Sequence, residues 1–317
     1  MERFIQGMLA LDRRWIYLTL AVTLLVALWF GKPLNPVVLP SVQQLYDAVE
    51  EAPAGPGQGK IVLVGMTFSA GTMGENANQA RAVLRHLMLR HKRFAIISIS
   101  EPQGAKFGKM MTTDIAKQYG YRYGIDWISF DYQLGTVALY KSLIYNIPNA
   151  IGVDGIEKKP IASFPIMQGI YNANDIALHI EITASSSVWD WIQIVQPATN
   201  PRLKIGYGCT GIMATEAYPL LDSGQLVGML PGLKGAADYE KLVDDLQTQE
   251  FQGGRVKAAA YDYAAPAVLT LPASARQLMF TQGAAHMVII LFIFIGNLGL
   301  LLSWLQKRSA RKEKANG

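Results

Sequence analysis

Cysteine is almost absent from this chain of 317 residues. Cys209 is the only one, so no internal disulfide can form and the fold must be held by an apolar core. A lone thiol is usually a small buried apolar residue, and the histidines offer no recognisable cysteine-protease signature. We therefore expect Cys209 to be structural rather than catalytic.

Recognised metal and catalytic patterns are missing too. His86 and His91 are five positions apart. This spacing does not bring them to one face of a helix, as the i,i+4 spacing of two metal ligands would. The G-x-G-x-x-G fingerprint, the P-loop lysine and the G-x-S-x-G elbow are all absent. The sequence thus predicts no metal and no cofactor, and it indicates no chemical activity.

Charged residues are missing from two stretches near the ends of the chain. Residues 284–305 contain no Asp, Glu, Lys or Arg, a run long enough for a helix to cross a hydrocarbon core of about 30 Å. Residues 15–31 form a shorter uncharged run. A cleaved signal peptide is the alternative for this run, but Trp29 and Phe30 stand where a small-residue cleavage site would be expected. We expect two transmembrane helices, 15–31 and 284–305.

Basic residues flank both runs on the side of the chain ends. They are Arg3, Arg13 and Arg14 before the first run, and Lys307, Arg308, Arg311, Lys312 and Lys314 after the second. Because Lys and Arg that flank a span stay in the cytoplasm, both termini are expected to be cytoplasmic. Residues 32–280 would then lie outside the cytoplasmic (inner) membrane.

The region between the tails carries no net charge. The tails hold eight of the 29 basic and three of the 24 acidic residues, which leaves 21 of each sign. The pI of about 9.1 therefore comes from the membrane flanks. Nucleic-acid binding needs basic residues clustered on a folded domain, so we expect the lipid bilayer as a partner and no nucleic acid.

Apolar, β-branched runs alternate with helical patterns through the middle of the chain. Strands are expected at 60–68, 94–100, 125–130, 175–183 and 202–208. Helices are expected between them, at 80–92, 106–121, 135–147 and 186–196. Such alternation predicts an α/β fold with a mostly parallel, doubly wound, Rossmann-like sheet. The segment 146–174 has no clear period and is expected to cover one edge of the sheet.

The expected organisation follows from these patterns. A short helix within "SVQQLYDAVEEA" is expected before the first strand, with Ser41 as its cap. The segments are a cytoplasmic N-terminus (1–14), a first transmembrane helix (15–31), a lead-in helix and linker (32–59), a Rossmann-like domain (60–248), an excursion returning to the membrane (249–283), a second transmembrane helix (284–305) and a basic cytoplasmic tail (306–317).

Candidate ligand contacts follow the first, fourth and fifth strands, because open α/β sheets bind ligands beyond the carboxyl ends of their strands. The loops concerned are "SAGTMGENANQ", "TASSSVWDW" and "GYGCTGIMATEAYP". The weak candidates in them are Ser69, Gly71, Ser185, Ser186, Gly208, Thr210 and Glu216. Ordinary turns, helix capping by the serines and close backbone packing at the glycines are the favoured alternatives.

Four residues of the second span are candidates for contacts in the membrane. His286, near the outer end, is expected to meet headgroups or a partner. Asn297 could hydrogen-bond across helices, and Gly296 and Gly299 would let another helix approach. Pairing with the first span is the simpler account, and assembly with other subunits is the alternative.

Four segments carry a resemblance to a known group. They are "DWISFDYQLGTVAL", "ITASSSVWDWIQIVQ", "EAYPLLDSGQLVGMLPGLKGAADYE" and "AAHMVIILFIFIGNLG". They resemble segments of widespread uncharacterised bacterial membrane proteins, over most of residues 40–300 and most specifically at 216–240. The resemblance implies one extracytoplasmic α/β domain between two membrane anchors, and it implies no activity. Residues 249–275 depart from the group.

Two functions fit these features. The favoured one is a non-enzymatic, membrane-anchored extracytoplasmic subunit that forms a homo-oligomer or docks on a membrane protein complex. The alternative is an extracytoplasmic domain that binds a small molecule or anion, or hydrolyses a substrate, through the loops after its strands. The fold does not choose between them, because this kind of fold hosts many functions.

Overall fold

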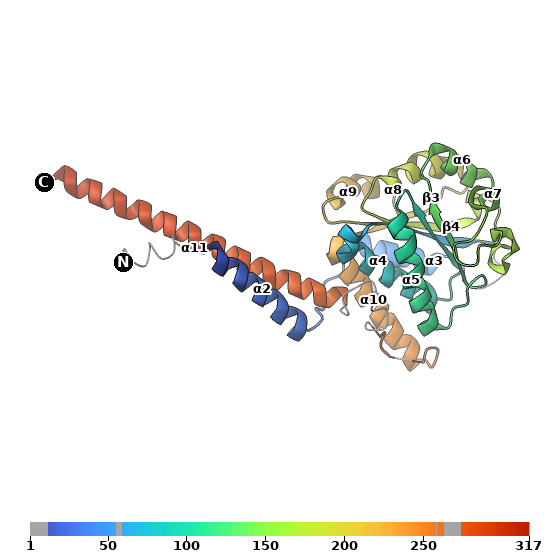
Figure 1. The fold of residues 1–317 in the computed structure, drawn as a ribbon, viewed down its shortest axis with the longest axis horizontal. Helices are drawn as coiled ribbons and strands as arrows, with labels where there is room; N and C mark the ends of the chain where they lie inside the picture. Colours follow the sequence, from blue (N-terminus) through green and yellow to red (C-terminus); the bar gives the residue numbers. More distant parts are fainter. Residues whose placement is uncertain (1–11, 55–58, 258, 263–273, 317) are drawn as a thin grey trace. The chain divides into compact units, whose positions relative to one another are not determined.

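The computed structural model describes residues 12–54, 59–257, 259–262 and 274–316 (Figure 1). The chain divides into two compact units, one made of residues 1–34 and 277–317 and the other of residues 35–276. Each unit is described by itself. The residues outside these ranges include the N-terminal residues 1–11 and residues 263–273 in the middle of the predicted excursion.

The larger unit is built on a six-stranded sheet in which every pairing is parallel. Its strands are β1 (Ile61–Thr67), β2 (Phe94–Ile99), β3 (Trp127–Gln133), β4 (Ile176–Thr183), β5 (Ile205–Cys209) and β6 (Gly228–Pro231). The order β3-β2-β1-β4-β5-β6 is that of a doubly wound Rossmann sheet. The predicted α/β class with a mostly parallel sheet is confirmed.

Helices cover both faces of this sheet and create two apolar layers. One face carries α3 (Pro40–Glu51), α4 (Met73–Leu89), α5 (Pro102–Tyr119) and α10 (Gly232–Gln252). The other carries α6 (Val137–Tyr145), α7 (Ile147–Ile151), α8 (Ser187–Asp190) and α9 (Ala214–Asp222). Short helical turns join them at Ala70–Thr72, Ile161–Ser163, Pro165–Met167, Ala173–Asp175, Trp191–Val195 and Gln196–Ala198. Burial on both faces explains why β1 reads as a continuous apolar run.

The segment 146–174 runs along the edge strand β3, as expected. The N–H of Gly155 donates to the carbonyl of Ser129 over 2.8 Å and thereby pairs part of the exposed edge. β3 itself continues to Gln133, beyond the predicted end at residue 130. The helix predicted at 106–121 is α5, which ends at Tyr119 because Gly120 adopts the left-handed conformation (φ 71°) that closes it.

The lead-in helix α3 belongs to the core of the larger unit. Leu45 is fully buried and lies so close to β5 and β6 that a Cβ at Gly206 would be 2.3 Å from its Cδ1, and one at Gly228 2.3 Å from its backbone nitrogen. Ser41 is buried inside α3 and does not cap it, so that prediction is wrong; Leu39 holds the cap position without a side-chain hydrogen bond.

The sequence reasoning missed β6 and the start of α10. Both lie in the glycine-rich block 216–240, which contains an edge strand and a helix in addition to turns. α10 then continues to Gln252, across the predicted domain boundary at residue 248.

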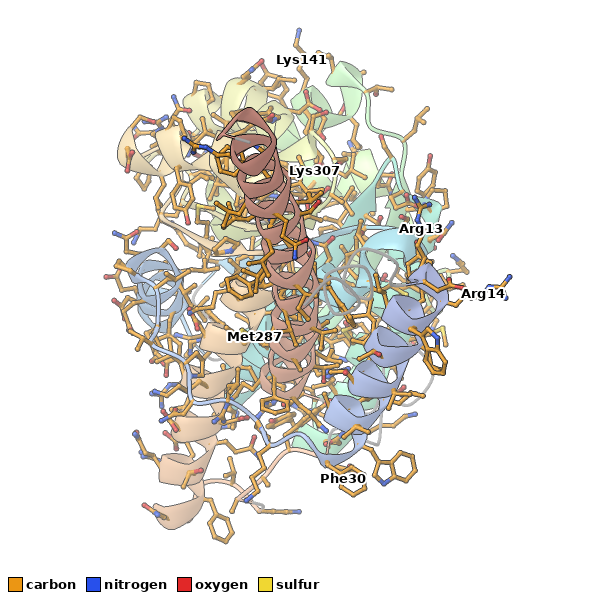
Figure 2. All side chains as sticks on the ribbon, turned by 90° about the vertical axis from the view of Figure 1, so that its left-hand side faces the viewer. Arg13, Arg14, Phe30, Lys141, Met287 and Lys307 are labelled. Atoms are coloured by element: carbon orange, nitrogen blue, oxygen red, sulfur yellow. The ribbon has the colours of Figure 1, made fainter. Side chains whose placement is uncertain are left out.

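The smaller unit contains most of two helices, α2 (Arg13–Phe30) and α11 (Ala275–Asn316). Both are long and apolar enough to cross a membrane, and few of their residues are buried. Figure 2 shows their side chains pointing outward, Phe30 and Met287 among them. The two helices meet where Gln277 Nε2 donates to the carbonyl of Leu28 over 2.9 Å.

α11 begins nine residues before the predicted span because an acidic side chain caps it. The carboxylate of Glu240 accepts hydrogen bonds from the backbone N–H groups of Ala275 (2.8 Å) and Arg276 (3.2 Å). These donors have no partner within the helix, and a negative charge at a helix N-terminus is favourable. The end of the predicted excursion is therefore helical.

Candidate functional site

The topological switch point of the sheet lies between β1 and β4, where the chain leaves one strand toward β2 and the other toward β5. An open cleft of about 450 Å³ lies at the carboxyl ends of these strands and of β5. It is lined by Gly71, Thr72, Gly74, Glu75, Ala184, Thr210, Ile212 and Met213. The fold thus places the loops after strands one, four and five around one cleft.

Two predicted residues line this cleft directly, Gly71 and Thr210. Ser69 stands just before the first turn of the loop, where its carbonyl accepts the N–H of Thr72 over 3.2 Å. Its side chain caps no helix. The loop after β1 therefore presents backbone and small side chains to the cleft.

The serines after β4 divide between capping and the core. Ser185 is exposed, and its Oγ accepts the N–H of Ser187 over 3.4 Å, one position before the cap residue of α8. Ser186 occupies the cap position of α8 but makes no side-chain hydrogen bond there. Ser187 turns inward, and its Oγ donates to Glu181 Oε1 over 2.7 Å.

The hydrogen bond from Ser187 leads to a buried acid–imidazole pair in the core. Glu181 Oε2 lies 2.9 Å from His179 Nε2, and both side chains are fully buried. Gly65 on β1 provides the space, because a Cβ there would be 1.9 Å from Glu181 Oε2. Sequence reasoning missed the pair. The signal was available, since residues 179 and 181 share one face of a strand and are polar in an otherwise apolar run.

The hydrogen bonds among Ser187, Glu181 and His179 do not form an activated nucleophile at the cleft. In a Ser-His-Asp triad the imidazole contacts the hydroxyl, whereas here the carboxylate of Glu181 lies between Ser187 and His179. Ser187 is also buried, away from solvent. The network joins β4 to α8 and serves packing.

Buried side-chain amides of α4 connect it to the carboxyl ends of β5 and β6. Gln79 Nε2 lies within 3.0 Å of the carbonyls of Cys209, Leu230 and Gly232, and Asn76 Nδ2 donates to Gln79 Oε1 over 3.0 Å. Sequence reasoning also missed this contact, which ties the carboxyl ends of β5 and β6 to one helix.

Gly208 is buried in β5, where it allows the close packing that was favoured for the glycines. A Cβ at this position would stand 2.9 Å from Gln79 Oε1. Cys209 is fully buried, and burial raises the pKa of its thiol to about 12, so the thiolate is scarce at neutral pH. Glu216 is exposed on α9 and is not among the described residues that line the cleft.

No known family, curated protein or solved structure matches this chain. The resemblance to uncharacterised membrane proteins therefore stays a prediction. Within the described residues, no group of three or more His, Cys, Asp or Glu side chains could hold a metal ion. The cleft must accordingly be interpreted from its own chemistry.

The electrostatics of the cleft disfavour an anionic ligand. Glu75 is the one charged residue among the described lining residues, and its Oε2 accepts the N–H of Gly211 over 2.7 Å. No described Lys, Arg or His side chain lines the cleft to neutralise a phosphate. The remaining side chains are small or apolar, so the cleft suits an apolar group.

The predicted membrane contacts lie on α11. His286 and Asn297 are exposed, and Gly299 has little exposed surface of its own. A Cβ at Gly296 would meet nothing within 4 Å among the described residues. The described contacts with α2 lie nearer the start of α11, where Gln277 donates to the carbonyl of Leu28 and where Phe280 and Ala284 line a pocket together with residues of α2.

Proposed function

We propose that this protein crosses the cytoplasmic membrane twice and carries its Rossmann-like domain outside the cytoplasm. Support comes from the length and apolar surface of α2 and α11. Arg13 and Arg14 begin α2, and Lys307 and Arg308 stand near the end of α11, an arrangement that favours two cytoplasmic ends.

Labelling of single introduced cysteines tests this topology. The lone native thiol of Cys209 is buried and reacts slowly, so it gives little background. In spheroplasts, a membrane-impermeant maleimide is expected to label Tyr145→Cys, at an exposed position of α6, and to label Lys307→Cys only after permeabilisation. The opposite pattern refutes the topology.

We further propose that the domain is a non-enzymatic subunit that docks on a protein partner, a second copy of itself or a membrane complex, through the carboxyl edge of its sheet. The observation that carries this proposal is Ile212, which is 89% exposed at the cleft. Leu134 and Val137, which follow β3, are also more than half exposed. β3 and β5 are four strand spacings apart, so Ile212 stands about 19 Å from Leu134 and Val137 along the same edge, and we call these three side chains the apolar row.

Exposed apolar side chains spread over this distance suit a protein surface better than a small ligand. The alternative, a small-molecule or hydrolytic site, is favoured by the position of the cleft at the switch point. It is weakened by the absence of a cation or an acid–base pair among the described lining residues. Glu216, which the sequence predicts as a ligand contact, is not one of those residues.

The mass of the full-length protein in a mild detergent, measured by light scattering and electron microscopy, tests the docking proposal. We expect a closed oligomer or a stoichiometric complex that Ile212→Ser disrupts. Val37→Ser is the matched control, because Val37 is equally exposed (87%) but lies outside the apolar row. A wild-type monomer at all concentrations, or equal assembly of both variants, would refute the proposal.

A further inference from the structure

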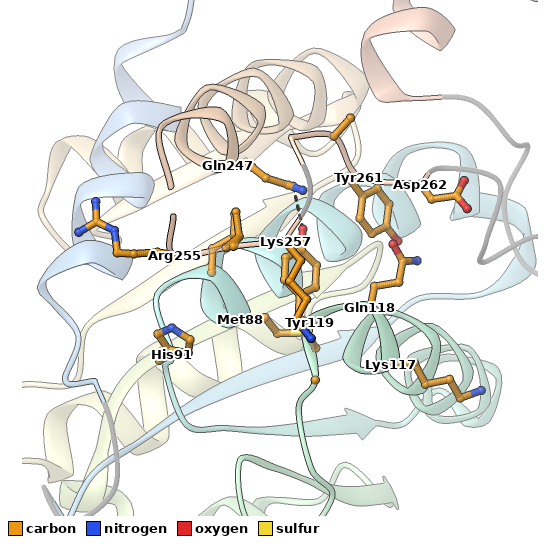
Figure 3. A pocket seen from close by; sticks show the side chains of 14 residues that line it. Met88, His91, Lys117, Gln118, Tyr119, Gln247, Arg255, Lys257, Tyr261 and Asp262 are labelled. Carbon is orange, nitrogen blue, oxygen red and sulfur yellow. Dashed lines mark hydrogen bonds between the residues drawn. The ribbon is translucent and has the colours of Figure 1, made fainter. Parts of the chain in front are cut away.

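A second pocket, of about 390 Å³, lies at the ends of α4, α5 and α10 (Figure 3). α4 and α5 run back from the carboxyl edge of the parallel sheet, so their last turns mark the opposite edge from the switch-point cleft. The size is within the usual range for a small-molecule site. The pocket has apolar and aromatic walls and a basic rim.

The aromatic wall is fixed by ring stacking and by a buried arginine. The rings of Tyr119 and Tyr261 stack with centroids 6.3 Å apart, and the guanidinium of buried Arg85 lies 4.3 Å from the ring of Tyr261. Tyr119 Oη donates to Gln247 Oε1 over 2.9 Å, which is the contact dashed in Figure 3. Met88 and Val256 extend this apolar surface.

The rim carries Lys117, Arg255, Lys257 and His91, against the single carboxylate of Asp262 among the described lining residues. Lys117 pairs with Asp114 at 3.3 Å, and Arg255 pairs with Glu250. Lys257 has no salt-bridge partner in the described part of the chain. Figure 3 shows its side chain among those that line the pocket.

An ordinary role for these cations would be to neutralise the carbonyl ends of the helices. Backbone N–H groups already do so here. Arg90 and Lys92 donate to the carbonyls of His86 (3.0 Å) and Leu87 (2.8 Å) at the end of α4, and Tyr121 donates to a carbonyl of α5 over 2.9 Å. Lys257 is therefore left available for another anion.

The pocket lies close to the start of α11 through a short series of hydrogen bonds. Arg85 Nη2 donates to Gln247 Oε1 over 2.9 Å and to Asp244 Oδ1 over 2.8 Å. Asp244 Oδ2 in turn accepts from Arg276 Nη1 over 3.4 Å. Arg276 stands in the first turn of the helix that we propose enters the bilayer.

We propose that this pocket binds an anionic amphiphile, with a phosphate group at Lys257 and an apolar body against Tyr119, Tyr261 and Met88. A soluble organic phosphate offers the same chemistry as a phospholipid headgroup. The proximity to the first turn of α11 favours the lipid.

Full-length protein in nanodiscs that contain equal amounts of phosphatidic acid and phosphatidylcholine tests this site. Native mass spectrometry after release from the discs measures the retained lipid, and calorimetry with glycerol 3-phosphate and inorganic phosphate tests the soluble source. Lys257→Gln is expected to reduce retention or affinity by about tenfold, the range of one charge-assisted hydrogen bond. Lys141→Gln, at an exposed lysine of α6, is the control (Figure 2).

Selective retention of phosphatidic acid that Lys257→Gln reduces about tenfold supports a lipid ligand. Binding of glycerol 3-phosphate with the same sensitivity supports a soluble ligand at the same site. No binding of any probe, or binding that Lys257→Gln and Lys141→Gln leave equally strong, would overturn the proposal. Lys257 is exposed, so both variants should fold, and equal melting temperatures verify this.

Discussion

Removal of one buried hydroxyl, by Tyr239→Phe, should measurably destabilise the larger unit. Tyr239 Oη lies 2.7 Å from His86 Nδ1, and His86 Nε2 lies 2.8 Å from Glu50 Oε1. Tyr239 and His86 are fully buried, and Tyr46 stacks on the imidazole with ring centroids 4.2 Å apart. These contacts join α3, α4 and α10.

The protonation states follow from the partners. Burial alone would raise the pKa of Glu50, but hydrogen bonds from His86 and Arg90 and the positive charge of Arg90 outweigh it and hold the pKa at about 2. Glu50 is therefore an acceptor at neutral pH, so His86 Nε2 must carry a proton. Burial lowers the pKa of His86, which keeps the ring neutral and leaves Nδ1 to accept from Tyr239.

Tyr239→Phe leaves that nitrogen buried without a donor, which costs about 1–3 kcal/mol. For a domain of this size we expect the melting temperature to fall by roughly 2–12 °C. Near-ultraviolet circular dichroism of full-length protein in detergent follows the transition. Tyr145→Phe, at a tyrosine that is 80% exposed, is the matched control. Equal melting of Tyr239→Phe and the control would refute the assigned hydrogen bond.

Three further predictions concern single side chains. Because the pKa of Glu50 is lowered from 4.5 to about 2, its contribution to stability is complete above pH 4.5 and is lost as pH falls toward 2; acid titration of Glu50→Gln should flatten this limb. Gly65→Ala should reduce the free energy of unfolding by several kcal/mol, since the new Cβ meets the carboxylate of Glu181, whereas Gly74→Ala, with nothing within 4 Å, should be neutral or slightly stabilising in chemical denaturation. Cys209 should resist maleimide in the native protein and react fully in denaturant, as mass spectrometry would show; rapid native labelling would contradict its burial.

Strong local patterns made the sheet predictable. Five strands were predicted because each contains apolar and β-branched residues, and β1, β2 and β5 are buried along their whole length. β6 was missed because it has only four residues, begins with Gly228 and ends with Pro231. A proline in a strand argues against a central position, yet it is tolerated in β6, which is the edge of the sheet.

The location of the cleft was predictable, but its chemistry was not. Strand order alone brings Gly71 and Thr210 to one edge. The exposure of Ile212 and the inward turn of Ser187 depend on loop conformations that residue type does not determine. The buried amide of Gln79 is satisfied by carbonyls 130 to 153 positions away, so no local pattern could have revealed it.

Both ends of the larger unit are fastened to the same helix. The N–H of Leu39 donates to Asp238 over 3.0 Å, and that of Ala275 donates to Glu240, two positions further along α10. The ends are therefore separated by about one helix diameter, roughly 10–12 Å. The domain is thus an insertion between two helices, and its two ends lie close together. If the flanking helices were removed, a short linker could join these ends. The joined domain could then be reopened at a surface turn such as Gly224 as a circular permutant, or transplanted between the helices of another hairpin.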